Sequence, residues 1–140
     1  MDVRERRWLY VLIAIFVVFN VVTLSPLVPW QGWLLWSQPA PSKSFPIEIA
    51  DYKMRLPAGG IQAQVGEYVE FVATSKDVTY GFGVFRPDST LVFQMQVLPG
   101  YQNRIVWKFD APGKYDVRST EYSGPRHSEM FIKDAVSVIR

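Results

Sequence analysis

The feature that most restricts this chain is an uncharged apolar segment near the N-terminus, WLYVLIAIFVVFNVVTLSPLV, residues 8–28. A helix rises about 1.5 Å per residue, so a helix over this segment is roughly 31 Å long, close to the thickness of a bilayer core. A secretory signal peptide is the alternative, but its apolar region is shorter and ends at a cleavage site of small residues, whereas PWQGWLLW follows here. We therefore predict an uncleaved, single membrane span.

Basic residues are distributed unequally around the predicted span. Arg4, Arg6 and Arg7 precede it, and the first basic residue after it is Lys43. Because Lys and Arg concentrate on the cytoplasmic side of membrane spans, we expect a cytoplasmic N-terminus and a periplasmic or extracellular C-terminal part.

Tryptophans mark both ends of the span. Trp8 opens it, and Trp30, Trp33 and Trp36 follow at a spacing of three, which places them on one side of a short helix or turn. Indole rings concentrate at the headgroup level of membranes, so we favour contact with membrane lipid over a groove for a lipid-soluble ligand. The Pro- and Ser-rich stretch that follows is typical of a linker.

From residue 45 onward, apolar residues alternate with polar ones. Stretches rich in Val, Ile, Phe and Tyr are separated by turn-forming segments such as PAGG, RPDS and APGK. This period of two predicts six or seven short strands, and about 95 residues of such strands are typical of a Greek-key sandwich. We therefore divide the chain into an anchor at 1–29, a Trp-rich linker at 30–44 and an extracytoplasmic β domain at 45–140.

Composition argues against several classes of function. The 140 residues carry 15 Lys and Arg against 13 Asp and Glu, a net charge of +2 without the basic stripe typical of nucleic-acid binding. The chain has no cysteine, so it contains no disulfide, thiolate metal site or cysteine nucleophile. A hydrolytic enzyme is disfavoured as well, because the single histidine, His127, has only serines nearby and no acid placed to orient it.

Several motifs resemble subunit II of the heme-copper oxidoreductases. The order VGEYVEF, DVTYGF, VLPG, APGKY and EYSGPRHSEM, after one N-terminal span, is similar to the short type with a single membrane helix, over residues 1–25 and 45–140. The resemblance implies an all-β, cupredoxin-like Greek-key sandwich outside the cell membrane of a prokaryote. In that family the domain holds CuA, a copper pair bridged by two cysteine thiolates and completed by two histidines, a methionine and a backbone carbonyl.

The CuA positions of this chain retain only part of the family's ligand set. The resemblance places these positions at Tyr80, Ser119, Glu121, Ser123, His127 and Met130. Ser119 and Ser123 occupy the positions of the two bridging cysteines. Tyr80 occupies the position of the first histidine, and Glu121 occupies the position of the carbonyl ligand. A serine hydroxyl stays protonated near neutral pH and is a poor copper ligand, so we expect no dinuclear centre and regard the six positions as vestigial.

Two further expectations concern these vestigial positions. One imidazole and one thioether fall short of the ligands that a mononuclear copper site needs, so we expect no metal and no cofactor in this chain. Tyr80 is expected to fill the vacated space, with its hydroxyl within reach of Ser119 or Ser123.

The resemblance also implies a function without a redox centre in this chain. Family members without CuA resemble the quinol-oxidising type, in which electrons enter subunit I directly from a membrane quinol. We therefore predict a non-catalytic subunit II of a respiratory quinol oxidase or a quinol-dependent nitric oxide reductase, with hemes and copper held by a polytopic subunit I. Its expected roles are to cap subunit I, to stabilise assembly and to border a quinol entrance with the tryptophans.

Glu5 is a candidate for proton entry. In the one-helix type, a glutamate just before the span and followed by Trp-Leu lies at the cytoplasmic mouth of a proton channel, and ERRWL places Glu5 there. A carboxylate at a bilayer surface can collect and relay protons. The alternative is a solvated charge, kept ionised by Arg4 and Arg6.

Two functions of other classes remain as alternatives. One is a membrane-anchored mononuclear copper carrier, against which the missing thiolates argue. The other is a metal-free binding module, for which the loops FRPDST and PAGG offer tips but no recognisable site.

Overall fold

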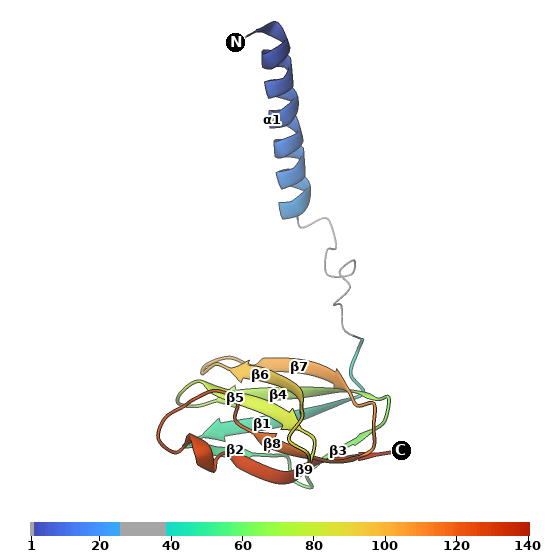
Figure 1. Cartoon of the computed structure of the whole chain (residues 1–140), viewed down its shortest axis with the longest axis vertical. Coiled ribbons are helices and arrows are strands. Elements are labelled where there is room, and N and C mark those ends of the chain that lie inside the picture. The colour runs from blue at the N-terminus through green and yellow to red at the C-terminus, as the bar shows by residue number, and fades with distance from the viewer. Residues whose placement is uncertain (1, 26–38) are drawn as a thin grey trace. The chain divides into compact units, whose positions relative to one another are not determined.

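The computed structural model describes residues 2–25 and 39–140 (Figure 1). One compact unit ends at Gln38 and a second begins at Pro39. Three of the four tryptophans assigned to the membrane interface, Trp30, Trp33 and Trp36, lie outside the described residues.

The helix α1 spans Val3–Leu24 and begins with a capping box. The backbone N–H of Asp2 donates to the Glu5 carboxylate at 2.9 Å, and the Asp2 carboxylate accepts from the Val3 N–H at 2.6 Å. The helix starts upstream of the apolar segment 8–28 and ends within it, because Pro26 follows Ser25 and the residue before a proline disfavours the α conformation. Glu5 therefore also caps the helix, a structural role that was not predicted from the sequence.

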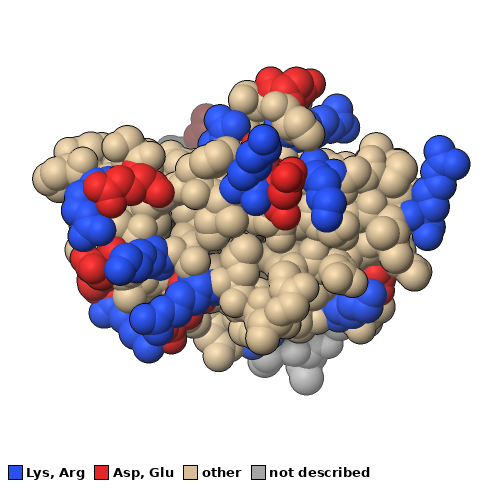
Figure 2. Space-filling view, turned by 90° about the horizontal axis from the view of Figure 1, so that it is seen from below, with Lys and Arg blue, Asp and Glu red and all other residues tan. Residues whose placement is uncertain are grey.

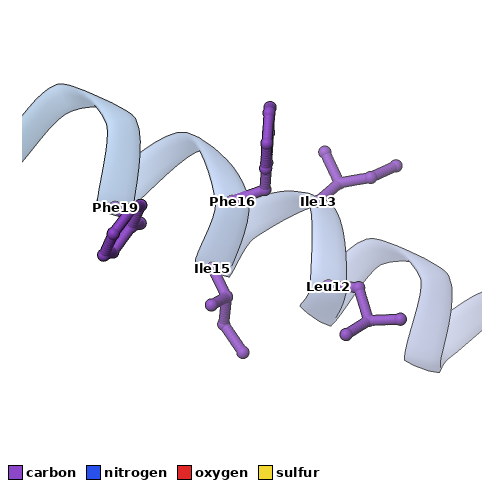
Figure 3. A pocket seen from close by; sticks show the side chains of 5 residues that line it. All are labelled: Leu12, Ile13, Ile15, Phe16 and Phe19. Atoms are coloured by element: carbon purple, nitrogen blue, oxygen red, sulfur yellow. The ribbon is translucent and has the colours of Figure 1, made fainter.

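From Trp8 onward, α1 carries apolar side chains on all sides with few polar ones among them, and none of its residues is buried. Figure 3 shows a shallow apolar hollow on this helix, lined by Leu12, Ile13, Ile15, Phe16 and Phe19. The side-chain donors of Asn20 and Thr23 are satisfied within the helix, at 2.8 and 2.7 Å from backbone carbonyls. As predicted, α1 is long and apolar enough to cross a membrane.

The second unit is a sandwich of two β-sheets (Figure 1). Its strands are β1 Lys43–Ala50, β2 Lys53–Arg55, β3 Ile61–Gln64, β4 Tyr68–Ser75, β5 Tyr80–Phe85, β6 Leu91–Val97, β7 Asn103–Lys108, β8 Gly113–Arg118 and β9 Phe131–Ile139. One sheet has the order β2-β1-β4-β7 and the other β3-β9-β8-β5-β6. β1 pairs with β4 and β3 pairs with β9 in parallel, whereas the other pairs are antiparallel.

The sandwich confirms the predicted architecture but divides the chain into more strands than expected. The stretch 45–56, which alternates like one strand, folds as the hairpin of β1 and β2 because Asp51 and Tyr52 adopt positive φ angles of 47° and 59°. β1 also begins at Lys43, upstream of the predicted start of the domain at residue 45.

The core lies between the two sheets. Alternating residues of the strands point inward, such as Ile47 and Ile49 of β1, which are 1% and 0% exposed. Phe71 is at the centre, with its ring centroid 5.8, 5.1 and 6.3 Å from those of Phe82, Phe93 and Phe109. Burying each such side chain contributes about 1.5–3 kcal/mol, so these rings stabilise the contact between the sheets.

Charged side chains of both signs are scattered over one face of the sandwich. Figure 2 shows Lys and Arg interspersed with Asp and Glu on one face, separated by wide uncharged areas. Ion pairs such as Lys43–Glu67 and Arg104–Glu70, with N···O distances of 3.3 and 3.2 Å, reflect this mixing. The face in Figure 2 therefore shows no basic stripe.

Candidate functional site

Five of the six vestigial positions lie in the segment 119–130, which connects β8 to β9, and the sixth, Tyr80, begins β5. The Ser119 N–H donates to the Met130 carbonyl at 3.1 Å, which closes the base of the segment. Near its end the segment forms a short 3₁₀ helix, His127–Glu129. Figure 1 shows this helix at one end of the sandwich, coloured red-orange.

The hydroxyls of Ser119 and Ser123 converge on one oxygen atom. Ser119 Oγ donates to the backbone carbonyl of Glu121 at 3.2 Å, and Ser123 Oγ donates to the same carbonyl at 3.0 Å. The Gly81 N–H in turn donates to Ser119 Oγ at 3.4 Å. The structure thus brings together the two positions that the resemblance assigns to bridging ligands and the position that it assigns to a carbonyl ligand.

Tyr80 is fully buried, with 0% of its surface exposed, and precedes Gly81 in β5. Its hydroxyl donates to Asp77 Oδ2 at 2.9 Å and accepts from the Tyr52 N–H at 3.2 Å. We expected the hydroxyl near Ser119 or Ser123, but its hydrogen bonds go to Asp77 and Tyr52. The physical reason is that a carboxylate is a stronger acceptor for a buried phenol than a serine hydroxyl.

The environment of Tyr80 and Asp77 determines which of the two groups carries the proton of their hydrogen bond. Burial raises the pKa of the Tyr80 phenol above its ordinary value, and the Asp77 carboxylate acts in the same direction. Burial also opposes ionisation of Asp77, but the N–H groups of Asp51 and Val78 and the Tyr80 hydroxyl donate to its carboxylate and lower its pKa below the ordinary value. At neutral pH a neutral phenol therefore donates to a carboxylate.

The turn between β1 and β2 is fastened to the same cluster. Asp51 and Tyr52 adopt positive φ angles, which are uncommon for residues other than glycine. The Asp51 N–H donates to Asp77 at 2.8 Å, and the Tyr52 hydroxyl donates to the Ser123 carbonyl at 3.0 Å. Arg126 pairs with Asp51 at 3.2 Å and places its guanidinium 5.3 Å from the Tyr52 ring centroid. These contacts hold the turn against the segment 119–130.

His127 and Met130 occupy different environments within the segment. His127 is half-buried, and its Nδ1 atom is buried without a hydrogen-bond partner among the described residues. Its ring centroid lies 5.9 Å from that of Tyr122, whose surface is 79% exposed. Met130 is 4% exposed and belongs to the hydrophobic core.

The donor set does not fit a dinuclear copper centre. Ser119 and Ser123 carry hydroxyls that already donate to a carbonyl, and the Tyr80 phenol is bonded to a carboxylate. Copper electron-transfer centres use thiolate and imidazole ligands, which these groups do not replace. Among residues 2–25 and 39–140, no three His, Cys, Asp or Glu side chains gather as a metal site.

Two residues of this cluster, Tyr52 and Asp77, were not predicted. They reach the cluster from the β1–β2 turn and from the loop between β4 and β5. Their signal in the sequence is weak, because Asp-Tyr interrupts a stretch that otherwise alternates like a strand, and only the folded chain shows what the turn contacts.

Gly81 and Gly83 allow the segment 119–121 to lie directly on β5. A Cβ atom at Gly81 would lie 2.5 Å from the Glu121 N atom and 2.6 Å from the Thr120 N atom. We expect Gly81→Ala to lower the free energy of unfolding by about 1–3 kcal/mol, the usual cost of overpacking, since the backbone has no way to rotate aside. Chemical denaturation of the full chain in detergent measures this loss.

Gly83→Ala is the matched control, because its Cβ atom would lie 2.5 Å from the Thr120 Cγ2 atom and 2.9 Å from the Phe85 Cε2 atom, whereas the nearest backbone atom, the Arg118 carbonyl oxygen, lies at 3.4 Å. Thr120→Ser removes that methyl group but keeps the hydroxyl and the backbone. Thr120→Ser should therefore recover part of the lost stability in the Gly83→Ala variant, where the Phe85 contact remains, and none in the Gly81→Ala variant. Equal recovery in both variants would contradict this packing.

No family model matches the chain. Cytochrome c oxidase subunit 2 of Thermus thermophilus is 26% identical over 102 residues, which cover 69% of this chain and 73% of that protein. A subunit 2 from another strain of the same species is also 26% identical over 102 residues, covering 69% of this chain and 58% of that protein. This chain thus spans somewhat more than half the length of the second relative.

Solved structures give a consistent picture of the fold. Auracyanin B matches 74% of this chain and 93% of its own with a TM-score of 0.58 and 11% identity. A chain of a heme-copper terminal oxidase dimer matches 98% of this chain and 99% of its own with a TM-score of 0.52 and 19% identity. The periplasmic domain of cytochrome oxidase subunit II from Bradyrhizobium japonicum matches 73% of this chain and 87% of its own with a TM-score of 0.51 and 15% identity.

These likenesses confirm the predicted fold class, a cupredoxin-like sandwich preceded by one apolar helix. The sequence is homologous to cytochrome c oxidase subunit 2. Together, the homology and α1 indicate a membrane-anchored protein.

Proposed function

We propose that this chain is the membrane-anchored, non-catalytic subunit II of a heme-copper terminal oxidoreductase that is fed by quinol. Homology to cytochrome c oxidase subunit 2 supports the assignment to such a complex. The observation that carries the quinol assignment is the set of hydroxyl donors at Ser119, Ser123 and Tyr80. Because hydroxyls do not build a thiolate-bridged copper pair, this chain offers a soluble cytochrome no entry point for its electrons.

In this proposal the electrons enter subunit I directly from membrane quinol, and the acceptor is oxygen or nitric oxide. Hemes and copper belong to the polytopic subunit I, whose outer face the sandwich caps and stabilises. The apolar circumference of α1 suits both lipid and the apolar helices of such a partner. Arg4, Arg6 and Arg7 favour a cytoplasmic N-terminus, which puts the sandwich on the opposite side of the membrane.

Copurification from the native membrane tests the complex itself. The tagged full chain should retain a polytopic partner with the visible absorption of heme. A matched control exchanges residues 3–24 for an unrelated apolar span and should lose part of that partner if α1 contributes contacts. A wild-type chain that purifies alone, without heme, would refute the assignment to this complex.

Glu5 serves as a proton-entry group at the cytoplasmic end of α1 in this proposal. Glu5→Gln is informative because glutamine in the same place still accepts from the Asp2 N–H and so keeps the capping box, but it does not ionise. We expect turnover of the complex to fall roughly tenfold, equivalent to about 1.4 kcal/mol of activation free energy, without loss of assembly. Steady-state quinol oxidation by the purified complex measures the effect.

Asp2→Ala is the control for the structural role of Glu5. It removes the side chain that accepts from the Val3 N–H, yet leaves the Glu5 carboxylate in place. If only the helix cap matters, Asp2→Ala should disturb the complex more than Glu5→Gln. Wild-type turnover of the Glu5→Gln variant at every pH would assign Glu5 to capping alone.

A further inference from the structure

A closed circuit of hydrogen bonds occupies the place where the resemblance puts a copper centre. Its members are Tyr52, Tyr80, Gly81, Ser119, Glu121 and Ser123. The Gly81 N–H donates to Ser119 Oγ at 3.4 Å, and both serine hydroxyls donate to the Glu121 carbonyl, at 3.2 and 3.0 Å. The Tyr52 hydroxyl donates to the Ser123 carbonyl at 3.0 Å, and the Tyr52 N–H donates to the Tyr80 hydroxyl at 3.2 Å. Tyr80 adjoins Gly81 in the chain, which closes the circuit.

We infer that this circuit, called the clasp below, replaces a metal as the cross-link that shapes the segment 119–130, so that the chain matures without copper. A copper pair in this family ties β5 to the segment through its ligands. The clasp ties the same two elements through hydroxyls and backbone groups that the chain itself supplies. The inference concerns the maturation of this chain and does not depend on which donor feeds electrons to the complex.

The rest of the segment is consistent with a cross-link made by the chain alone. The Met130 N–H donates to the His127 carbonyl at 3.1 Å, and the Ser119 N–H donates to the Met130 carbonyl at 3.1 Å. The two positions that still match the family's ligands are therefore held through their backbones, and Met130 is additionally packed in the core. Arg126 adds a bond to Glu129 at 3.1 Å and an ion pair with Asp51 at 3.2 Å.

Hydrogen–deuterium exchange on the full chain in detergent micelles tests the clasp. The readout is the amides of Ser119, His127, Glu129 and Met130, each of which donates to a backbone carbonyl. In the Ser119→Ala/Ser123→Ala variant these amides should exchange roughly tenfold faster, because three hydrogen bonds that hold the segment are lost, including the one from the Gly81 N–H. Amides of β4 should keep their wild-type rates.

The matched control removes two hydroxyls from strands outside the clasp. Ser44 donates to Glu70 at 2.9 Å, and Ser137 accepts from Lys114 at 3.3 Å. Ser44→Ala/Ser137→Ala should leave the four amides of the segment unchanged. Tyr52→Phe removes only the hydroxyl that reaches Ser123 and keeps the test decisive if the double serine variant unfolds. Wild-type exchange in both clasp variants would overturn the inference.

A second arm of the experiment addresses copper directly. Exchange of the wild-type segment should be the same after growth in copper-depleted medium, after addition of Cu²⁺ and after treatment with a chelator. A gain in protection with copper would overturn the inference, since it would assign the cross-link to a metal. A complex that fails to oxidise quinol would refute the proposed electron donor and leave these exchange rates untouched.

Discussion

Three substitutions, Tyr80→His, Ser119→Cys and Ser123→Cys, are expected to give this chain a thiolate-bridged copper centre that the wild-type chain lacks. Together with His127, Met130 and the Glu121 carbonyl, they complete the ligand set of the family that the sequence resembles. The geometry favours the change, because the two serine Oγ atoms already lie 3.2 and 3.0 Å from the Glu121 carbonyl oxygen. The full-length triple variant in detergent should bind about two copper ions and develop intense visible absorption from thiolate-to-copper charge transfer.

Among the three substitutions, Tyr80→His is expected to lower the stability of the fold the most. Tyr80→His removes a hydroxyl that donates to Asp77 and accepts from the Tyr52 N–H. Asp77 is exposed and Tyr52 is half-buried, so water can replace the phenol, and losing each hydrogen bond costs about 0.5–1.5 kcal/mol. Metal ligands must also be placed within roughly 0.5 Å, so incomplete loading is expected. The Ser119→Cys/Ser123→Cys variant is the control, because it has both thiolates but only one imidazole and should bind copper less tightly. A folded triple variant without any copper would show that the segment 119–130 does not descend from a copper-binding loop.

The purified complex is expected to oxidise a short-chain quinol roughly a hundredfold faster than a reduced soluble cytochrome, equivalent to about 2.7 kcal/mol of activation free energy. The physical reason lies in Ser119, Ser123 and Tyr80, whose hydroxyls provide no thiolate or imidazole ligand for an electron-accepting copper pair. Oxygen or nitric oxide consumption with each donor measures the ratio. Metal analysis of the same sample should find no copper beyond the copper that subunit I holds.

The triple variant supplies an internal control for this second prediction. If the copper pair forms in the assembled complex, the rate with reduced cytochrome should rise while the rate with quinol stays the same. Rapid cytochrome oxidation by the wild-type complex would refute quinol feeding, whatever its rate with quinol.

The sequence predicted features that depend on local pattern. The alternation of apolar residues in β4, such as Val69, Phe71 and Ala73, places them inward, and all three are fully buried. The uncharged segment likewise predicted a helix long enough to span a membrane, and α1 confirms it. In both cases neighbouring residues in the chain determine which surface turns away from water.

The features that escaped prediction depend on contacts between distant residues. Tyr80 was expected to place its hydroxyl near the serines, but its hydroxyl partner Asp77 comes from the loop between β4 and β5, which the sequence pattern does not place. The capping contact of Glu5 is local and could have been found, because Asp2 followed by Glu5 matches the spacing of a capping box. The role of Tyr52 could not have been found in the sequence, because its hydrogen bond to Ser123 joins residues 71 positions apart.

The position of β9 has a consequence for the biogenesis of the protein. This strand lies between β8 and β3, and its parallel register with β3 pairs Ile61 with Val136 and Ala63 with Val138. Among the described strands β3 pairs only with β9, so its partner does not exist until β4 to β8 have been synthesised. Pairing of strands so distant in sequence is slow, and an unpaired strand edge is a site of aggregation. The domain therefore completes this sheet only after translation has passed β9, and until then the edge of β3 is open to association with other chains.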